Sequence, residues 1–270
     1  YAGHQFGGFS ILGDGRAHHL WEFQNDEKLY DVQLKGSWLS VYSRTGDGLA
    51  TISSMLREYL VSESMAALGI SSSRSLGVFA TGEQMNRSGD NSGAILARIA
   101  SSHIRVGTFE YIAMLDDVKL LEEFTTYTIH RHYPDINRDA NLYQNFITKV
   151  WETQIDLVIN WLRVGFIHGV MNTDNTFISG ETLDYGPCAF LNTYKPGKVY
   201  SSIDRESRYS YLNQANIILW NMSRFTETLL PLLSANHDDA VEKAKEILSH
   251  LEKNIQKKYI SMLLAKLWDL

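Results

Sequence analysis

The chain has 270 residues, of which 44% are hydrophobic and 21% charged, and its formal net charge is −6. This composition can bury a sizeable core and excludes a disordered chain, while the negative charge offers no general attraction for nucleic acid or anionic membranes. The single cysteine, Cys188, excludes an intramolecular disulfide and a cysteine-based zinc site, and no apolar run is long enough to span a bilayer.

The first sixteen residues contain five glycines, which let backbone approach a ligand closely. Within them, Gly13, Gly15 and Arg16 offer backbone N–H groups and a guanidinium that could cap a phosphate. A hairpin turn is the alternative, and the commoner one for Gly-x-Gly alone. Because the chain begins at Tyr1 rather than Met, we expect a fragment of a longer chain.

Residues 30–35 alternate polar and apolar side chains, which predicts a strand with one buried face that ends in Lys35. A helix capped by Thr51 and ended by Gly69 follows. Its predicted apolar stripe consists of Ile52, Met55, Leu56, Tyr59 and Leu60. Glu58 flanks this stripe and could face Lys35, as a helix glutamate faces the strand lysine in kinases. The alternative for both residues is a solvated surface position.

Two further strands are predicted at 76–81 and 94–100, joined by a polar turn, and the loop at 42–48 suits contact with a nucleotide. Arg98 lies on the second strand and Arg105 follows it. Two arginines could clamp phosphate through forked hydrogen bonds, whereas an internal salt bridge is the equally favoured alternative for Arg98.

From residue 110 onwards the periodicity becomes helical. Helices are predicted at 115–130, 142–164, 213–233, 238–251 and 252–270, the second of them apolar nearly all round and therefore buried. The sequence thus predicts an α+β protein with a small β-rich lobe at 1–109 and a larger helical lobe at 110–270.

Residues 168–175 read His-Gly-Val-Met-Asn-Thr-Asp-Asn, and Asp-Tyr-Gly follows at 184–186. This is the layout of a kinase catalytic loop and metal loop, with one difference. The position of the usual catalytic Asp is held by Val170, which can neither take a proton nor bind a cation. His168 is expected to be a structural hydrogen-bonding residue.

The ligands for a metal are nevertheless present in these two loops. Asn175 and Asp184 offer the hard oxygen atoms that Mg2+ or Mn2+ prefers, and Asp174 adds a carboxylate beside them. A plain turn is the alternative for the Asn-Thr-Asp-Asn segment alone. The spacing to Asp184, together with Lys35 and Glu58 upstream, favours the metal site.

Together these residues form a set of motifs along some two hundred residues. They are Tyr-Ala-Gly-His-Gln-Phe-Gly-Gly at 1–8, Leu-Gly-Asp-Gly-Arg at 12–16, Gln-Leu-Lys-Gly at 33–36, Tyr-Ser-Arg at 42–44, Arg-Glu-Tyr-Leu at 57–60, Ser-His-Ile-Arg at 102–105, the loop at 168–175 and Asp-Tyr-Gly-Pro at 184–187. In these motifs the chain resembles the selenoprotein O family of pseudokinase-fold enzymes.

The resemblance implies a two-lobed protein kinase-like fold that binds ATP in reversed orientation with Mg2+ or Mn2+. It implies transfer of AMP to Ser, Thr or Tyr hydroxyls of protein substrates, with release of pyrophosphate. The roles implied are Lys35 paired with Glu58 and contacting phosphate, Arg98 and Arg105 holding the phosphate tail, Asn175 and Asp184 binding the metal, Asp174 as base, and Gly13, Gly15, Arg16, Asp47 and Gly48 as further nucleotide contacts.

The chain departs from the family pattern at 37–41, where Ser-Trp-Leu-Ser-Val replaces the usual Ala-Gly-Arg-Thr-Pro, and at Cys188-Ala189. Two other functions stay open: a phosphotransferase that uses Asp174, and a catalytically silent ATP-binding scaffold. We expect no nucleic-acid or membrane partner. The expected compartment is the cytoplasm for a bacterial source and the mitochondrion for a eukaryotic one.

Overall fold

The computed structural model describes residues 2–13, 15–43, 46–85 and 92–268, and it is α+β, as predicted. Of the predicted features, Asp14, Arg44, Thr45 and part of the polar turn at 86–91 lie outside the described residues. The chain divides by its internal contacts into two units. Unit 1 comprises Tyr1–Ala2, Phe9–His103 and Glu181–Gly186, and unit 2 comprises Gly3–Gly8, Ile104–Gly180 and Pro187–Leu270.

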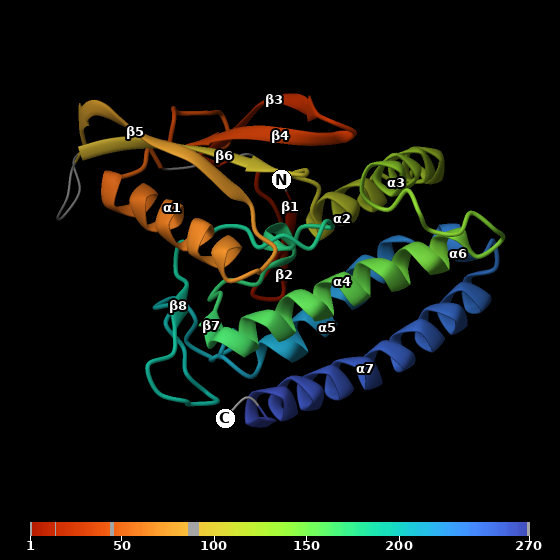
Figure 1. Ribbon diagram of the computed structural model, residues 1–270. Coiled ribbons are helices and arrows are strands. Elements are labelled where there is room, and N and C mark those ends of the chain that lie inside the picture. Colours follow the sequence, from red (N-terminus) through yellow and green to blue (C-terminus); the bar gives the residue numbers. More distant parts are fainter. Residues whose placement is uncertain (1, 14, 44–45, 86–91, 269–270) are drawn as a thin grey trace. The chain divides into compact units, whose positions relative to one another are not determined.

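Unit 1 is built on a four-stranded antiparallel sheet (Figure 1). Its strand order is β3 (Ala17–Asn25), β4 (Lys28–Lys35), β6 (Ser92–Ala100) and β5 (Arg74–Gln84). The predicted strand ending in Lys35 is confirmed as β4, but the prediction of a single buried face is wrong. Asp31, Gln33 and Lys35, on its polar face, are buried as well. This burial is possible because each of them has a charged or hydrogen-bonding partner inside unit 1.

Helix α1 (Ile52–Ala67) contacts strands β5 and β6 of this sheet (Figure 1). The predicted cap is confirmed, since the Thr51 side chain accepts a hydrogen bond from the backbone N–H of Ser54 at 3.3 Å. The predicted apolar stripe is only partly buried: Met55 is fully buried, whereas Leu56 and Leu60 are 43% and 62% exposed. The buried face of α1 consists of Met55, Glu58, Ser62 and Met65. A glutamate therefore stands at its centre.

Unit 2 is mainly helical. Its helices are α2 (Val106–Met114), α3 (Val118–His132), α4 (Leu142–Val164), α5 (Gln214–Thr228), α6 (Leu230–Leu233) and α7 (His237–Trp268). The predicted helix at 213–233 is interrupted, because Pro231 has no N–H to continue α5 and lies in the first turn of α6 instead. The two helices predicted at 238–251 and 252–270 form one helix. Leu251 and Ile255 lie on one buried stripe that crosses the expected break.

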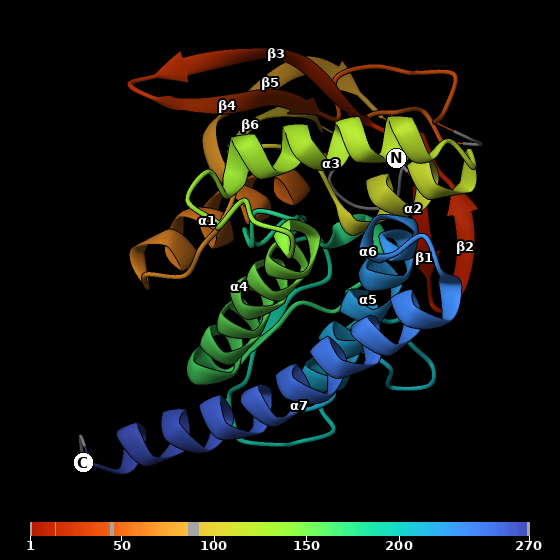
Figure 2. The ribbon, with the colours of Figure 1, turned by 90° about the vertical axis from the view of Figure 1, so that its right-hand side faces the viewer.

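The helix predicted to be buried is confirmed as α4, which packs against α5 and α7 (Figures 1 and 2). Its buried Trp151 donates its indole N–H to the hydroxyl of Thr226 on α5 at 3.1 Å, so the buried donor is satisfied. Gly165 ends α4 in the left-handed conformation, with φ 72°. The short antiparallel pair β7 (Phe166–Ile167) and β8 (Ala189–Phe190) follows.

The remaining elements are short. The 3-10 turn η1 (Thr173–Asn175) lies within the predicted catalytic loop. Strands β1 (Ala2–Gln5) and β2 (Gly8–Ile11) each have residues in both units. Among the described residues, no helix combines the length and hydrophobicity needed to cross a membrane.

We predict that Met55→Ala lowers the free energy of unfolding by about 2–5 kcal/mol, because it leaves a cavity beside Ala50 and Leu96 in the core of unit 1. The matched control is Leu60→Ala on the same helix, where the exposed side chain predicts a change within about 0.5 kcal/mol. Urea denaturation followed by circular dichroism measures both. Equal losses in the two variants would contradict the assignment of the buried face.

Candidate functional site

A cluster of four charged side chains lies in unit 1. The Lys35 ammonium contacts both Glu58 Oε1 and Asp184 Oδ1. The second oxygen of Glu58 accepts from Arg98 Nη2 at 2.8 Å, and Arg98 Nη1 donates to Gln33 Oε1 at 3.2 Å. The predicted Lys35–Glu58 ion pair is therefore present, and Arg98 forms the internal salt bridge that was one of its two predicted states.

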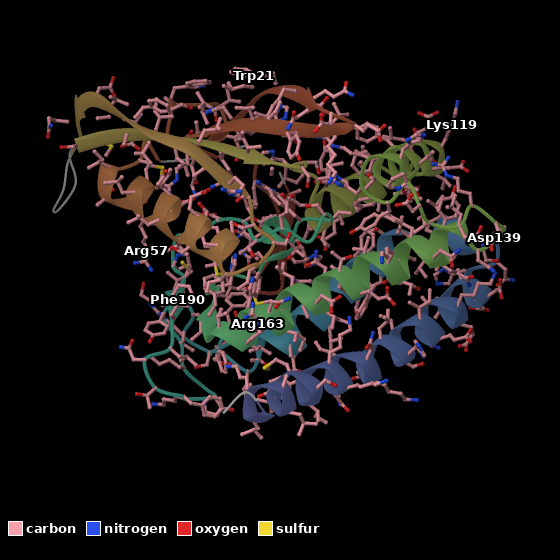
Figure 3. The ribbon with its side chains drawn as sticks, in the orientation of Figure 1. Trp21, Arg57, Lys119, Asp139, Arg163 and Phe190 are labelled. Atoms are coloured by element: carbon pink, nitrogen blue, oxygen red, sulfur yellow. The ribbon has the colours of Figure 1, made fainter. Side chains whose placement is uncertain are left out.

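Three elements bring these groups together. Lys35 ends β4, and Arg98 lies on the adjacent strand β6, where it is the direct cross-strand partner of Gln33. Glu58 comes from the buried face of α1, in contrast to its neighbour Arg57, which is exposed (Figure 3). Buried charges must be paired, and truncating one partner of such a pair costs about 3–5 kcal/mol. The cluster thus fixes β4, β6 and α1 with respect to one another.

Asp184 is the most open member of the cluster, with 36% of its side chain exposed. It adopts φ 65°, a left-handed conformation that is unusual for a residue with a side chain and common at functional loops. Burial acts to raise the pKa of Asp184, but the positive charges of Lys35 and Arg98 outweigh it and hold this pKa well below its ordinary value. Asp184 is therefore ionised over the whole physiological range.

Gly13 and Gly15 lie within unit 1 beside Tyr42 and Ser43, in the loop that follows β4. Gly13 has φ 59°, and an added Cβ would lie 2.1 Å from the ring of Tyr42, so only glycine fits. Ser43 Oγ donates to the carbonyl oxygen of Gly15 at 2.6 Å. Two stretches predicted separately as nucleotide contacts are thus adjacent at their described residues, Gly13 and Gly15 in one and Tyr42 and Ser43 in the other.

The other predicted nucleotide contacts lie in the same part of unit 1. Arg16 Nη1 donates to the carbonyl oxygen of Leu49 at 3.5 Å. Asp47 accepts from the backbone N–H of Leu49 at 3.0 Å, and Gly48 lies between them. Burial raises the pKa of Asp184, whereas the positive charges of Lys35 and Arg98 lower it. Arg16 adds a smaller effect that also lowers this pKa.

The unusual segment at 37–41 has its own partners. Ser37 Oγ lies 2.9 Å from His18 Nδ1, and the indole of Trp38 stacks on the His18 ring with centroids 4.4 Å apart. His18, which lies on strand β3, thus contacts both Ser37 and Trp38. Ser37 and Trp38 are thus held by local contacts within unit 1.

The predicted catalytic loop lies in unit 2. Asn175 donates from its side-chain nitrogen to the carbonyl oxygen of Val170 at 3.1 Å. Asp174 is buried and accepts from Gln5 Nε2 at 3.4 Å. His168 is structural, as expected: its backbone N–H donates to Gln214 Oε1 at 2.9 Å and its ring stacks on Trp161.

Arg105 caps the N-terminus of α2 in unit 2, where its buried guanidinium lies 5.5 Å from the ring centroid of Phe177. The structure thus brings Lys35, Glu58, Arg98 and Asp184 together in unit 1. Asp174, Asn175 and Arg105 belong to unit 2.

Sequence reasoning missed one further group in unit 1 that could hold a metal ion: His19, Asp31 and His103, whose ligand atoms lie within 4.8 Å of one another. Asp31 Oδ2 lies 3.4 Å from His19 Nε2 and 3.2 Å from His103 Nδ1, and it accepts from the backbone N–H of His103 at 2.8 Å. The residues come from two strands and a later loop, so only the strand pairing could have indicated the group. Its contacts satisfy the buried carboxylate of Asp31 within the protein.

The fold and the site together define an α+β protein with a buried lysine–glutamate pair in its β-rich unit and an acidic loop in its helical unit. The model of the family described as protein adenylyltransferase SelO matches residues 1–268. The chain belongs to this family, and the resemblance predicted from its motifs is confirmed.

The curated relatives include proteins named protein nucleotidyltransferase YdiU. The one from Clostridium perfringens is 54% identical over 268 residues, which is 99% of this chain and 55% of that protein. The one from Alkaliphilus metalliredigens is 51% identical over 99% of this chain and 55% of that protein, and the one from Pelagibacter ubique is 50% identical over 99% and 56%. The chain spans about half the length of these relatives.

We predict that Asp184→Asn lowers the free energy of unfolding by about 1–2 kcal/mol at pH 7, because the Lys35 ammonium loses an ionised partner. Asn tolerates the left-handed backbone, so the change tests the charge. Since the folded-state pKa is lowered, the contribution of the charge is complete above about pH 5 and falls below about pH 4.

Urea denaturation between pH 3 and pH 7 measures this prediction. The difference between wild type and Asp184→Asn should shrink as the pH falls. Asp156→Asn, which removes a carboxylate from a surface pair with Lys258, is the control and should change stability by less than about 1 kcal/mol. A difference that stays constant with pH would contradict an ionised Asp184 in the cluster.

Proposed function

We propose that this chain is the nucleotide-handling part of a protein adenylyltransferase, which transfers AMP from ATP to Ser, Thr or Tyr hydroxyls of proteins. The observation that carries the proposal is the buried Lys35–Glu58–Asp184 network in a chain of this family. The proposal includes a kinase-like two-lobed fold, with the small lobe at 1–109 and the helical lobe at 110–270. For a bacterial source we expect the cytoplasm, and for a eukaryotic one the mitochondrion.

In this proposal Lys35 contacts a phosphate of ATP while Glu58 fixes its direction, as in kinases. Arg98 and Arg105 hold the β- and γ-phosphates through charge-assisted hydrogen bonds. Gly13, Gly15, Arg16, Asp47 and Gly48 contact the remainder of the nucleotide. Glu58 has a second role, because its other oxygen fixes Arg98.

Asp184 and Asn175 each supply an oxygen ligand to Mg2+ or Mn2+. The ionised state of Asp184 suits this role, and the Asn175 side chain already donates through its nitrogen to Val170, which leaves the carboxamide oxygen as the ligand atom. A bound divalent cation would neutralise charge that develops on the phosphate oxygens. The group in unit 1 formed by His19, Asp31 and His103 has no part in this proposal.

Asp174 is proposed as the base. It accepts the proton of the attacking hydroxyl while the hydroxyl oxygen bonds to the α-phosphorus, and the bond from that phosphorus to the bridging oxygen breaks to release pyrophosphate. A kinase transfers the γ-phosphoryl group beside a loop Asp, whereas this chain has Val170 at that position. The aliphatic side chain removes the usual base and favours AMP as the transferred group.

We predict that incubation with Mg2+ or Mn2+ and ATP labelled at the α-phosphate labels protein, whereas ATP labelled at the γ-phosphate does not. Autoradiography of the separated chain, supported by a mass increase corresponding to AMP, measures this. Label from the γ-position alone would instead identify a phosphotransferase. Binding of ATP with no label from either position would identify a catalytically silent scaffold.

We also predict that Lys35→Met weakens ATP binding and lowers the transfer rate about 100-fold, because a charge-assisted contact to phosphate is lost. Stability should fall, but the fold should persist, since Glu58 keeps Arg98 as a partner. Lys28→Met is the matched control: Lys28 lies on the same strand and is exposed. Titration calorimetry with ATP and circular dichroism measure both properties. A Lys35→Met protein that unfolds without ATP while Lys28→Met does not would show that Lys35 is a structural residue.

A further inference from the structure

Residues 3–6 lie directly against the catalytic loop within unit 2, although the two segments are 169 residues apart in the chain. The backbone N–H of His4 donates to Thr173 Oγ1 at 2.6 Å. The Gln5 side chain donates to Asp174 Oδ2 at 3.4 Å, and the backbone N–H of Phe6 donates to Asn172 Oδ1 at 3.4 Å. Three successive residues of one segment thus each contact a different residue of the other.

A buried carboxylate closes this arrangement into a ring. Glu110 on α2 is buried, and its Oε2 accepts from Thr173 Oγ1 at 2.5 Å. Its Oε1 lies 2.5 Å from His4 Nδ1. A hydrogen bond therefore joins the His4 ring to this carboxyl group. The bonds therefore run from the His4 backbone to Thr173, from Thr173 to Glu110, and from the His4 ring back to Glu110.

The close approach of the two segments depends on Gly3. A Cβ at this position would lie 2.6 Å from Thr173 Oγ1 and 2.8 Å from the backbone nitrogen of Asp174, which no real side chain could occupy. The Trp220 ring packs edge-on against the His4 ring with centroids 5.4 Å apart. Trp220 thus packs against the His4 side of this ring of hydrogen bonds.

The turn held by these contacts is η1, which contains both Asp174 and Asn175. Asn172, at its start, also accepts from the hydroxyl of Tyr209 at 2.6 Å. A three-residue turn has little rigidity of its own, since 3-10 geometry is weak and runs in short pieces. Its position must therefore come from outside contacts, and the ring supplies contacts to Thr173, the residue next to Asp174.

We propose that His4, Glu110 and Thr173 are positioning residues that hold Asp174 in its reactive place, and that Gln5 supports them by donating to the Asp174 carboxylate. This rests on the proposed role of Asp174 as the base. The segment at 3–8 is then part of the catalytic apparatus of unit 2 and not of a phosphate-binding loop. Because these residues hold the loop that carries Asp174, we expect their substitution to slow the transfer of AMP.

The sharpest test compares Thr173→Val with Thr173→Ser. Valine has the shape of threonine but lacks the hydroxyl, which is both acceptor for His4 and donor to Glu110, whereas serine keeps it. We predict that Thr173→Val lowers the rate of AMP incorporation at saturating ATP by about 100-fold, the cost of misplacing a catalytic group by about 1 Å. The ATP concentration for half-maximal rate should change little. Thr173→Ser should restore most of the rate.

The rate is measured with α-labelled ATP and the chain itself as acceptor. An unchanged rate in Thr173→Val, or an equal loss in Thr173→Ser, would overturn the proposal. Should Thr173→Val not fold, His4→Phe is the second variant, because it keeps a ring against Trp220 and removes Nδ1. His130→Phe, at an exposed histidine of α3, is its control.

Hydrogen–deuterium exchange of the amides at 172–176, without nucleotide, separates this inference from the proposed function. We expect faster exchange in Thr173→Val than in wild type, and recovery in Thr173→Ser. If wild type transfers no AMP but exchange responds in this way, the proposed function fails and the positioning role stands. If wild type transfers AMP while neither rate nor exchange responds to Thr173→Val, the positioning role fails and the function stands.

Discussion

The organisation of unit 1 depends on the burial of one carboxylate, Glu58, between two cations. A glutamate in the middle of a helix cannot be buried unless its charge is compensated, and here Lys35 takes one oxygen and Arg98 the other. This requirement fixes which face of α1 meets the sheet and places the two cations side by side on β4 and β6. Lys35 also contacts Asp184, whose backbone is in the left-handed conformation.

Unit 2 uses the same physical principle at a different place. Glu110 is a buried carboxyl group whose oxygens are satisfied by the His4 ring and the Thr173 hydroxyl, which are 169 residues apart in the chain. Burying a carboxyl group without hydrogen-bonding partners is costly, so both partners must stay in place. In each unit one buried acid therefore fixes a loop that carries proposed site residues: Asp184 in unit 1 and Asp174 in unit 2.

Much of the fold could be predicted because its signals are local. The cap at Thr51, the buried helix α4 and its glycine stop are all set by residues within one or two turns of one another. Errors arose where packing overrules local pattern. Leu60 belongs to an apolar stripe in the sequence yet is exposed, because the face of α1 that contains Glu58 is the one buried. The long helix α7 was divided in two because its weak periodicity gave no sign of the continuous stripe through Leu251.

By itself the sequence determined the family, the α+β class and the residue types of the site: Lys35 with Glu58, and the two acidic loops around Asp174 and Asp184. These follow from the order and spacing of the motifs, which can be read directly from the amino-acid sequence. Only the tertiary structure decided that Arg98 shares Glu58 with the lysine, and that residues 4–6 near the start of the chain contact the catalytic loop. Such contacts depend on which buried polar groups pair in the folded chain. Because the partners are up to 169 residues apart, neither periodicity nor local motifs in the sequence indicate the pairing.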